Sequence, residues 1–209
     1  MSKLAIPKKA SAKKKMEAKY LDKRNQIWQP MTGMEENSRI LWEQKTKTGF
    51  VNIPRVMPLI LNIMDYLVKK EGGKPVSNTY FALVCRDFGT AFIEIKDNDE
   101  LASEAGFSGN RATTTLNSRL KLLNTETKTG LGFIRTQKTS TGKYKAILML
   151  NPLLIVFLHY KQGRIPKPMY DELYMRCTDI GDKNLKTMQD AGDKYVKQAT
   201  AFLDSLQDT

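Results

Sequence analysis

Apolar residues recur at intervals of three and four along much of the chain, which is the spacing that buries one face of a helix. The stretch 52–70 predicts a core helix, ended by the glycine pair at 72–73. Similar spacing predicts short helices after residue 77 and between residues 97 and 106, a helix from 108 to 123, and an apolar helix over 152–162. The chain is therefore expected to be mainly α-helical.

Two regions instead alternate apolar and polar residues, which is typical of strands with one buried face. Residues 90–95 predict a short strand. Residues 131–138 and 143–150 flank a polar turn at 140–142 and predict a two-stranded hairpin. The expected fold class is mainly α with a small β hairpin.

The helix expected over 108–123 has an unusual polar face. Its leucines and Ala112 form one apolar stripe, and Ser108 is a good N-cap residue. Thr, Asn and Ser are poor helix formers, so a solvated face would favour Glu, Lys and Gln instead. The edges of DNA bases are a partner that would select such short donors and acceptors. The candidate base-reading residues are Ser108, Asn110, Arg111, Thr113, Thr114, Asn117, Ser118, Arg119 and Lys121.

The charge of the chain favours a polyanionic partner. It has 34 Lys and Arg against 22 Asp and Glu, a net charge of +12. Between Ser108 and Tyr144 seven basic residues face one acid, Glu126. Residues 1–24 carry nine basic residues and two acids and are expected to be a disordered arm that binds the DNA backbone; a solubilising tail or an exposed helix is the alternative. The arm's candidate contacts are Lys8, Lys9, Lys13, Lys14 and Lys15.

The order helix, helix, short strand, helix, turn, helix, hairpin over residues 57–151 resembles the winged helix-turn-helix family of DNA-binding domains. The resemblance implies that the helix at 108–123 enters the major groove of double-stranded DNA. It also implies that the hairpin is a wing that touches the DNA backbone or minor groove. The wing residues are Lys138, Thr139, Ser140, Thr141, Lys143 and Tyr144.

A wider stretch, from GFVNIPR to YMRCTDIG, is similar to proteins carried on bacterial plasmids and other mobile elements. This likeness implies bacterial DNA as the partner and brings no catalytic residues. The alternative for a winged-helix module is a role in protein contacts, since a fold does not dictate a function.

The C-terminal part is predicted to hold a helical seam. The expected divisions are the arm (1–24), an irregular segment (25–56), a winged helix-turn-helix domain (57–162) and a C-terminal helical segment (163–209). In that last segment, apolar residues at alternating spacings of three and four suggest a homodimer, with packing on the chain's own domain as the alternative. The proposed dimerisation residues are Leu185, Met188, Tyr195, Phe202 and Leu206.

The sequence offers no recognisable catalytic or metal-binding chemistry. Nucleotide-binding, metalloprotease and hydrolase motifs do not occur, and we expect neither a cofactor nor a small-molecule substrate. The single histidine, His159, favours a structural or surface role, and the widely separated Cys85 and Cys177 suggest neither a disulfide framework nor a zinc site. The sequence has no long apolar run, so we expect a cytoplasmic protein. We expect it to be a non-enzymatic DNA-binding protein, either a dimeric regulator or a plasmid replication or maintenance factor. An architectural DNA-binding protein with little sequence preference, or a protein-interaction adaptor, is the alternative.

Overall fold

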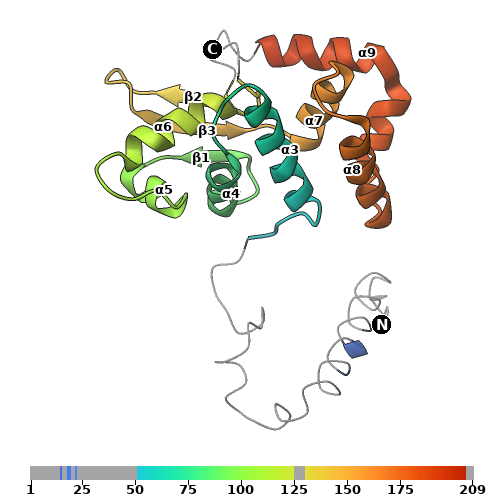
Figure 1. The fold of residues 1–209 in the computed structure, drawn as a ribbon, viewed down its shortest axis with the longest axis horizontal. Coiled ribbons are helices and arrows are strands. Elements are labelled where there is room, and N and C mark those ends of the chain that lie inside the picture. The colour runs from blue at the N-terminus through green and yellow to red at the C-terminus, as the bar shows by residue number, and fades with distance from the viewer. Residues whose placement is uncertain (1–14, 16–17, 20–21, 23–50, 125–129, 206–209) are drawn as a thin grey trace, which may run out of the picture. The chain divides into compact units, whose positions relative to one another are not determined.

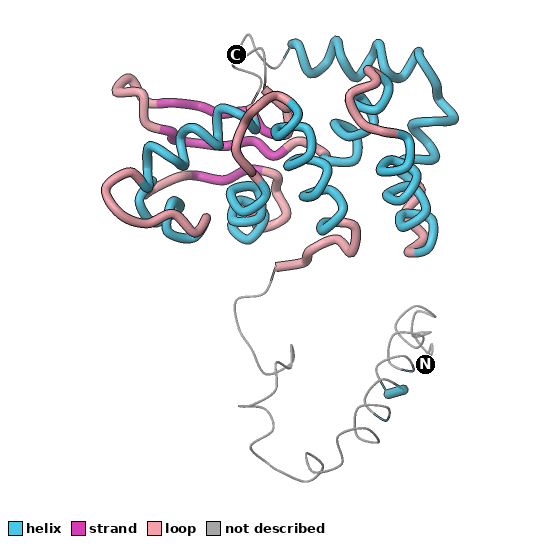
Figure 2. The backbone as a smooth tube through the Cα atoms, viewed as in Figure 1, coloured by secondary structure: helices cyan, strands magenta, loops and turns pink. Residues whose placement is uncertain are grey.

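Helices and a small antiparallel sheet build the part of the chain that the computed structural model describes (Figures 1 and 2). The described residues are 15, 18, 19, 22, 51–124 and 130–205. Those between 15 and 22 are helical and exposed, while residues from Val51 onward form one unit. In this unit the elements follow in the order α3 (Met57–Lys70), α4 (Ser77–Arg86), β1 (Phe92–Glu94), α5 (Asn98–Glu104), α6 (Ala112–Leu123), β2 (Ile134–Lys138), β3 (Tyr144–Met149), α7 (Pro152–Lys161), α8 (Lys167–Asp179) and α9 (Asn184–Ser205). The predicted mainly helical fold with a β hairpin is confirmed.

The sheet is three-stranded and antiparallel, with β3 between β1 and β2. Ile93 lies opposite Ile147, and Thr136 lies opposite Ile147 on the other side, so these side chains share the face that is buried against the helices. On the other face Phe92, Leu148 and Arg135 are aligned. The strand expected at 90–95 therefore joins the hairpin as its third strand.

The core helix α3 forms as its spacing predicts. Pro58 stands in its first turn, where a missing N–H costs little. Ile60, Ile63, Met64 and Leu67 are almost completely buried, and the helix packs against α4, α7 and α8. Burying such side chains contributes roughly 1.5–3 kcal/mol each, so this face anchors the unit.

Helix α7 is apolar around most of its circumference because it is enclosed. Its N-cap residue Asn151 accepts a hydrogen bond from the Leu153 amide at 3.0 Å. Ile155, Val156 and Phe157 are all at most 3% exposed, with α3 and α9 packed against the helix. The described part of the chain contains no helix with the length and apolar character of a membrane span.

The predicted dimerisation seam is wrong for its first half. Leu185 and Met188 are buried in the chain's own core, where α9 packs on α7 and α8. The seam is also not one straight stripe, because Gly192 has φ 63° and ψ −151° and kinks α9. Apolar spacing reports that a helix face is buried, but it does not say whether the burying surface belongs to the same chain.

The second half of α9 also contacts its own chain. Tyr195 is half-buried against the core, and the backbone oxygen of Leu203 accepts a hydrogen bond from Arg135 Nη2 of β2 at 3.2 Å. Phe202 is 61% exposed, and Leu206 lies outside the described residues. Helix α9 therefore packs largely within the unit.

Candidate nucleic-acid interface

Helix α6 exposes one narrow polar stripe. Arg111, Thr114, Ser118 and Lys121 are all exposed and follow at spacings of three, four and three, while Leu116, Leu120 and Leu123 are completely buried on the opposite side. This division follows from the 3.6-residue period of the helix. The stripe combines two cations with two hydroxyl groups, so it can contact both phosphates and base edges.

The helix starts later than the sequence suggested. Its first residue is Ala112 and its N-cap position is Arg111, which makes no side-chain capping bond, so Ser108 is not the cap. Gly106 and Gly109 have φ of 81° and 76°, a left-handed conformation that glycine adopts readily and that extends the turn before α6. Ser108 and Asn110 are therefore exposed residues of the turn that precedes the helix.

Three other candidate base-reading residues lie on the flanks of the stripe and are half-buried. The Thr113 hydroxyl donates to the Asp99 carboxylate of α5. Asn117 Oδ1 is enclosed and accepts no hydrogen bond from the described residues. The Arg119 guanidinium lies over the Phe107 ring, 6.0 Å from its centroid. Thr113 and Arg119 contact other side chains and Asn117 Oδ1 is enclosed, so the exposed stripe is the better candidate for base contacts.

The hairpin tip presents a second polar surface. Its turn is closed by a bond from the Thr139 amide to the Lys143 oxygen (2.8 Å) and by a 2.9 Å contact between the hydroxyls of Thr139 and Thr141. Lys138, Thr139, Ser140, Thr141 and Lys143 are all exposed. Tyr144 is the exception, because it is 2% exposed and lies under Lys138, whose Nζ is 4.9 Å from the ring centroid. The prediction that the Tyr144 side chain contacts DNA is therefore wrong.

Two further lysines were missed by the sequence reasoning. Lys145 of β3 and Lys96, which follows β1, are both exposed, and the Ile95 amide bonds to the Lys145 oxygen at 2.8 Å. They lie beside each other at the end of the sheet that continues into the hairpin tip. Burial does not alternate along β3, where Lys145 is followed by the buried Ala146 and Ile147, so the strand period alone does not mark Lys145 as exposed.

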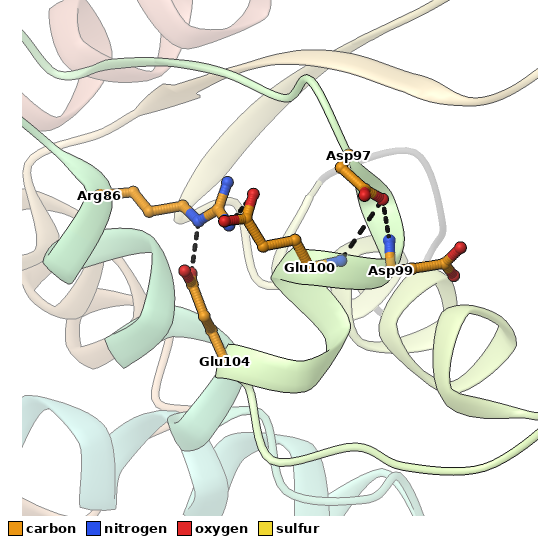
Figure 3. A network of polar contacts seen from close by, with 5 residues as sticks. All are labelled: Arg86, Asp97, Asp99, Glu100 and Glu104. Atoms are coloured by element: carbon orange, nitrogen blue, oxygen red, sulfur yellow. Dashed lines mark hydrogen bonds and ion pairs between the residues drawn. The ribbon is translucent and has the colours of Figure 1, made fainter.

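A polar network joins α4 to α5, the helix on which α6 packs (Figure 3). Arg86 of α4 pairs with Glu104 and, at 3.1 Å, with Glu100 of α5. The hydrogen bond to Glu104 is the main cause that raises the pKa of Arg86. The Asp97 carboxylate caps α5 by accepting from the amides of Asp99 (2.8 Å) and Glu100 (3.4 Å). Together these contacts hold α5 in place, and α5 packs on α6.

The proposed arm lies almost wholly outside the described residues. Lys8, Lys9, Lys13 and Lys14 are not described, and Lys15 is exposed in a helical conformation. The contribution of the arm to binding stays a prediction from its charge.

The described residues hold no cluster of three metal-ligating side chains. His159 is buried and bonded through both ring nitrogens, 2.8 Å from the Leu131 oxygen and 3.0 Å from Arg164 Nη1. Cys177 is buried, and Cys85 is a free, exposed thiol. His159 is therefore part of the packing of the fold.

Comparison with protein-family models, with curated proteins and with solved structures found no match to this chain.

Proposed function

We propose that the chain binds double-stranded DNA as a winged helix-turn-helix protein, with α6 in the major groove and the hairpin β2–β3 as the wing. The observation that carries the proposal is the exposed stripe of α6, formed by Arg111, Thr114, Ser118 and Lys121. Cations and hydroxyl groups in one row on a helix match the phosphates and base edges of a groove.

Two further observations support the proposal. Strand order β1-β3-β2, with α5 and α6 between β1 and β2, is the arrangement that this class of domain would have. The hairpin tip and α6 lie at the same end of the unit (Figure 1), and their described residues from 108 to 124 and 130 to 144 include no Asp or Glu. A duplex contacting both elements would therefore meet a cationic surface.

In the cell this protein would act on bacterial DNA, as a transcriptional regulator or as a replication or maintenance factor of a mobile element. Selection of bound duplexes from a random pool at about physiological salt, followed by sequencing, tests the proposal. Specific binding should exceed non-specific binding by about 10³-fold or more. Retention without an enriched motif would favour an architectural protein, and an absence of retention would overturn DNA binding.

One observation favours a second candidate, a protein-interaction adaptor. Phe88 is 95% exposed, in a loop ordered by the Asp87 carboxylate, which accepts hydrogen bonds from the amides of Gly89, Thr90 and Ala91 at 3.0–3.1 Å. An exposed aromatic side chain on such a loop is a common anchor of protein interfaces. If the adaptor is correct, Arg111→Ala and Lys143→Ala leave DNA retention unchanged, while Phe88→Ser abolishes binding of the protein partner.

A further inference from the structure

The first turn of α5 contacts both elements proposed to hold DNA. On one side the Asp99 carboxylate accepts the Thr113 hydroxyl of α6. On the other side Asn98 Nδ2 donates to the backbone oxygen of Tyr144, the first residue of β3, at 3.4 Å. A duplex that contacts both α6 and the hairpin tip therefore passes close to this turn.

This turn carries the opposite charge to its neighbours. Residues 97–110 contain four acids and neither Lys nor Arg. Asp97, Asp99 and Glu100 are exposed, and the ion pairs of the described residues include neither Asp97 nor Asp99. Glu100 pairs with Arg86, but Arg86 also pairs with Glu104, so the one cation leaves this group of carboxylates net negative. A phosphate approaching here meets like charges at short range.

The turn also lacks the amide donors that a phosphate would need. The free N–H groups at the start of a helix attract anions, but the Asp97 carboxylate already accepts those of Asp99 and Glu100 (Figure 3). The Asp97 carboxylate therefore occupies the amide groups that a backbone phosphate would need here.

We propose that the acidic first turn of α5, through Asp97, Asp99 and Glu100, is a specificity-determining element that repels the DNA backbone from the surface next to α6 and the wing. This inference rests on the proposed function. In the cognate register α6 lies in the major groove, and the phosphates contact α6 and the wing at positions away from the carboxylates. In other registers a phosphate faces the carboxylates, so non-specific binding is weakened more than specific binding.

The test is the double variant Asp99→Asn/Glu100→Gln in the full chain. Both changes are isosteric and keep the Asp97 cap. Asp99→Asn leaves an oxygen that can accept the Thr113 hydroxyl, and after Glu100→Gln the Arg86 guanidinium keeps its pair with Glu104. Affinity is measured by fluorescence anisotropy for a duplex of scrambled sequence and for the duplex obtained by selection. The matched control is Glu172→Gln/Asp179→Asn, which removes two exposed carboxylates from α8, at the end of the unit away from α6 (Figure 1).

The double variant should bind the scrambled duplex about three- to tenfold more tightly, and the selected duplex by a smaller factor, so the specificity ratio falls. The control should change affinity less than about twofold, since α8 lies at the other end of the unit from α6 and salt screens charges that are far from the duplex (Figure 1). Glu100→Gln alone, which leaves Asp99 in place, should give a smaller rise in the same direction.

Unchanged or weaker binding by the double variant, or an equal rise in the control, overturns the inference while leaving the proposed function intact. Failure of the unmodified chain to bind either duplex overturns the proposed function, and the inference with it.

Discussion

Acidification below about pH 6.5 should destabilise the fold, because His159 is held in its neutral form. The Leu131 oxygen can only accept, so Nε2 carries the hydrogen at 2.8 Å. The Arg164 guanidinium can only donate, so Nδ1, at 3.0 Å, must accept. A proton added to Nδ1 would face that guanidinium, which is itself paired with Glu71.

The direction of the effect follows from the pKa. Burial is the main cause that lowers the pKa of His159, and the charge of Arg164 lowers it further, while the hydrogen bond to Leu131 and the charge of Glu71 act in the opposite direction. Below the unfolded pKa of about 6.5 the unfolded chain binds more protons than the folded one, so stability falls as the pH falls. The contribution is fully present above about pH 6.5 and is lost toward the lowered folded pKa.

The loss of stability has an upper limit, because one titrating group changes the unfolding free energy by at most about 1.4 kcal/mol per pH unit. Urea unfolding between pH 7.5 and pH 5.0 should therefore show a loss of up to about 2 kcal/mol from this residue. His159→Gln, which does not titrate, is the control and should have a flatter profile over the same range. Since the chain has one histidine, its NMR signal gives the folded pKa directly. Equal pH profiles for both proteins, or a folded pKa at or above 6.5, would refute the reasoning.

Three further outcomes are expected. Arg111→Ala should cost about 1–3 kcal/mol on the selected duplex and relax its specificity, as measured by anisotropy, whereas equal losses on all duplexes would reassign Arg111 to phosphate contact. Deleting residues 2–24 should flatten the slope of log affinity against log salt, because fewer counterions are released, and an unchanged slope would remove the arm from the interface. Leu185→Ala should lower the unfolding free energy by about 2–5 kcal/mol without changing the sedimentation coefficient; a change of oligomeric state at unchanged stability would instead support the dimer seam.

Local patterns were sufficient to predict most of the elements. The spacing of leucines around Leu116 and Leu120 located the buried side of α6, and the polar turn at 140–142 located the hairpin. Both features depend on neighbouring residues and on a periodicity that any buried helix or strand must show.

The errors came from the backbone geometry of one turn and from contacts that depend on the fold. Ser108 has the right chemistry for a cap, but the left-handed glycines on either side continue the turn past it. Tyr144 lies in a polar stretch, yet its position on β3 places its side chain under Lys138. The sequence alone also could not show that Asp99 reaches Thr113, because this contact depends on the packing of α5 against α6.

The central claim is that the exposed stripe of α6 holds DNA, and charge-matched variants test it most directly. Arg111→Ala/Lys121→Ala removes two exposed cations from the stripe, and Lys194→Ala/Lys197→Ala removes two exposed cations from α9. Each is measured by anisotropy against the selected duplex at about physiological salt. The stripe variant should lose affinity by about tenfold or more, while the α9 variant should stay within about threefold. Equal losses from both variants, or no loss from the stripe variant, would contradict the account.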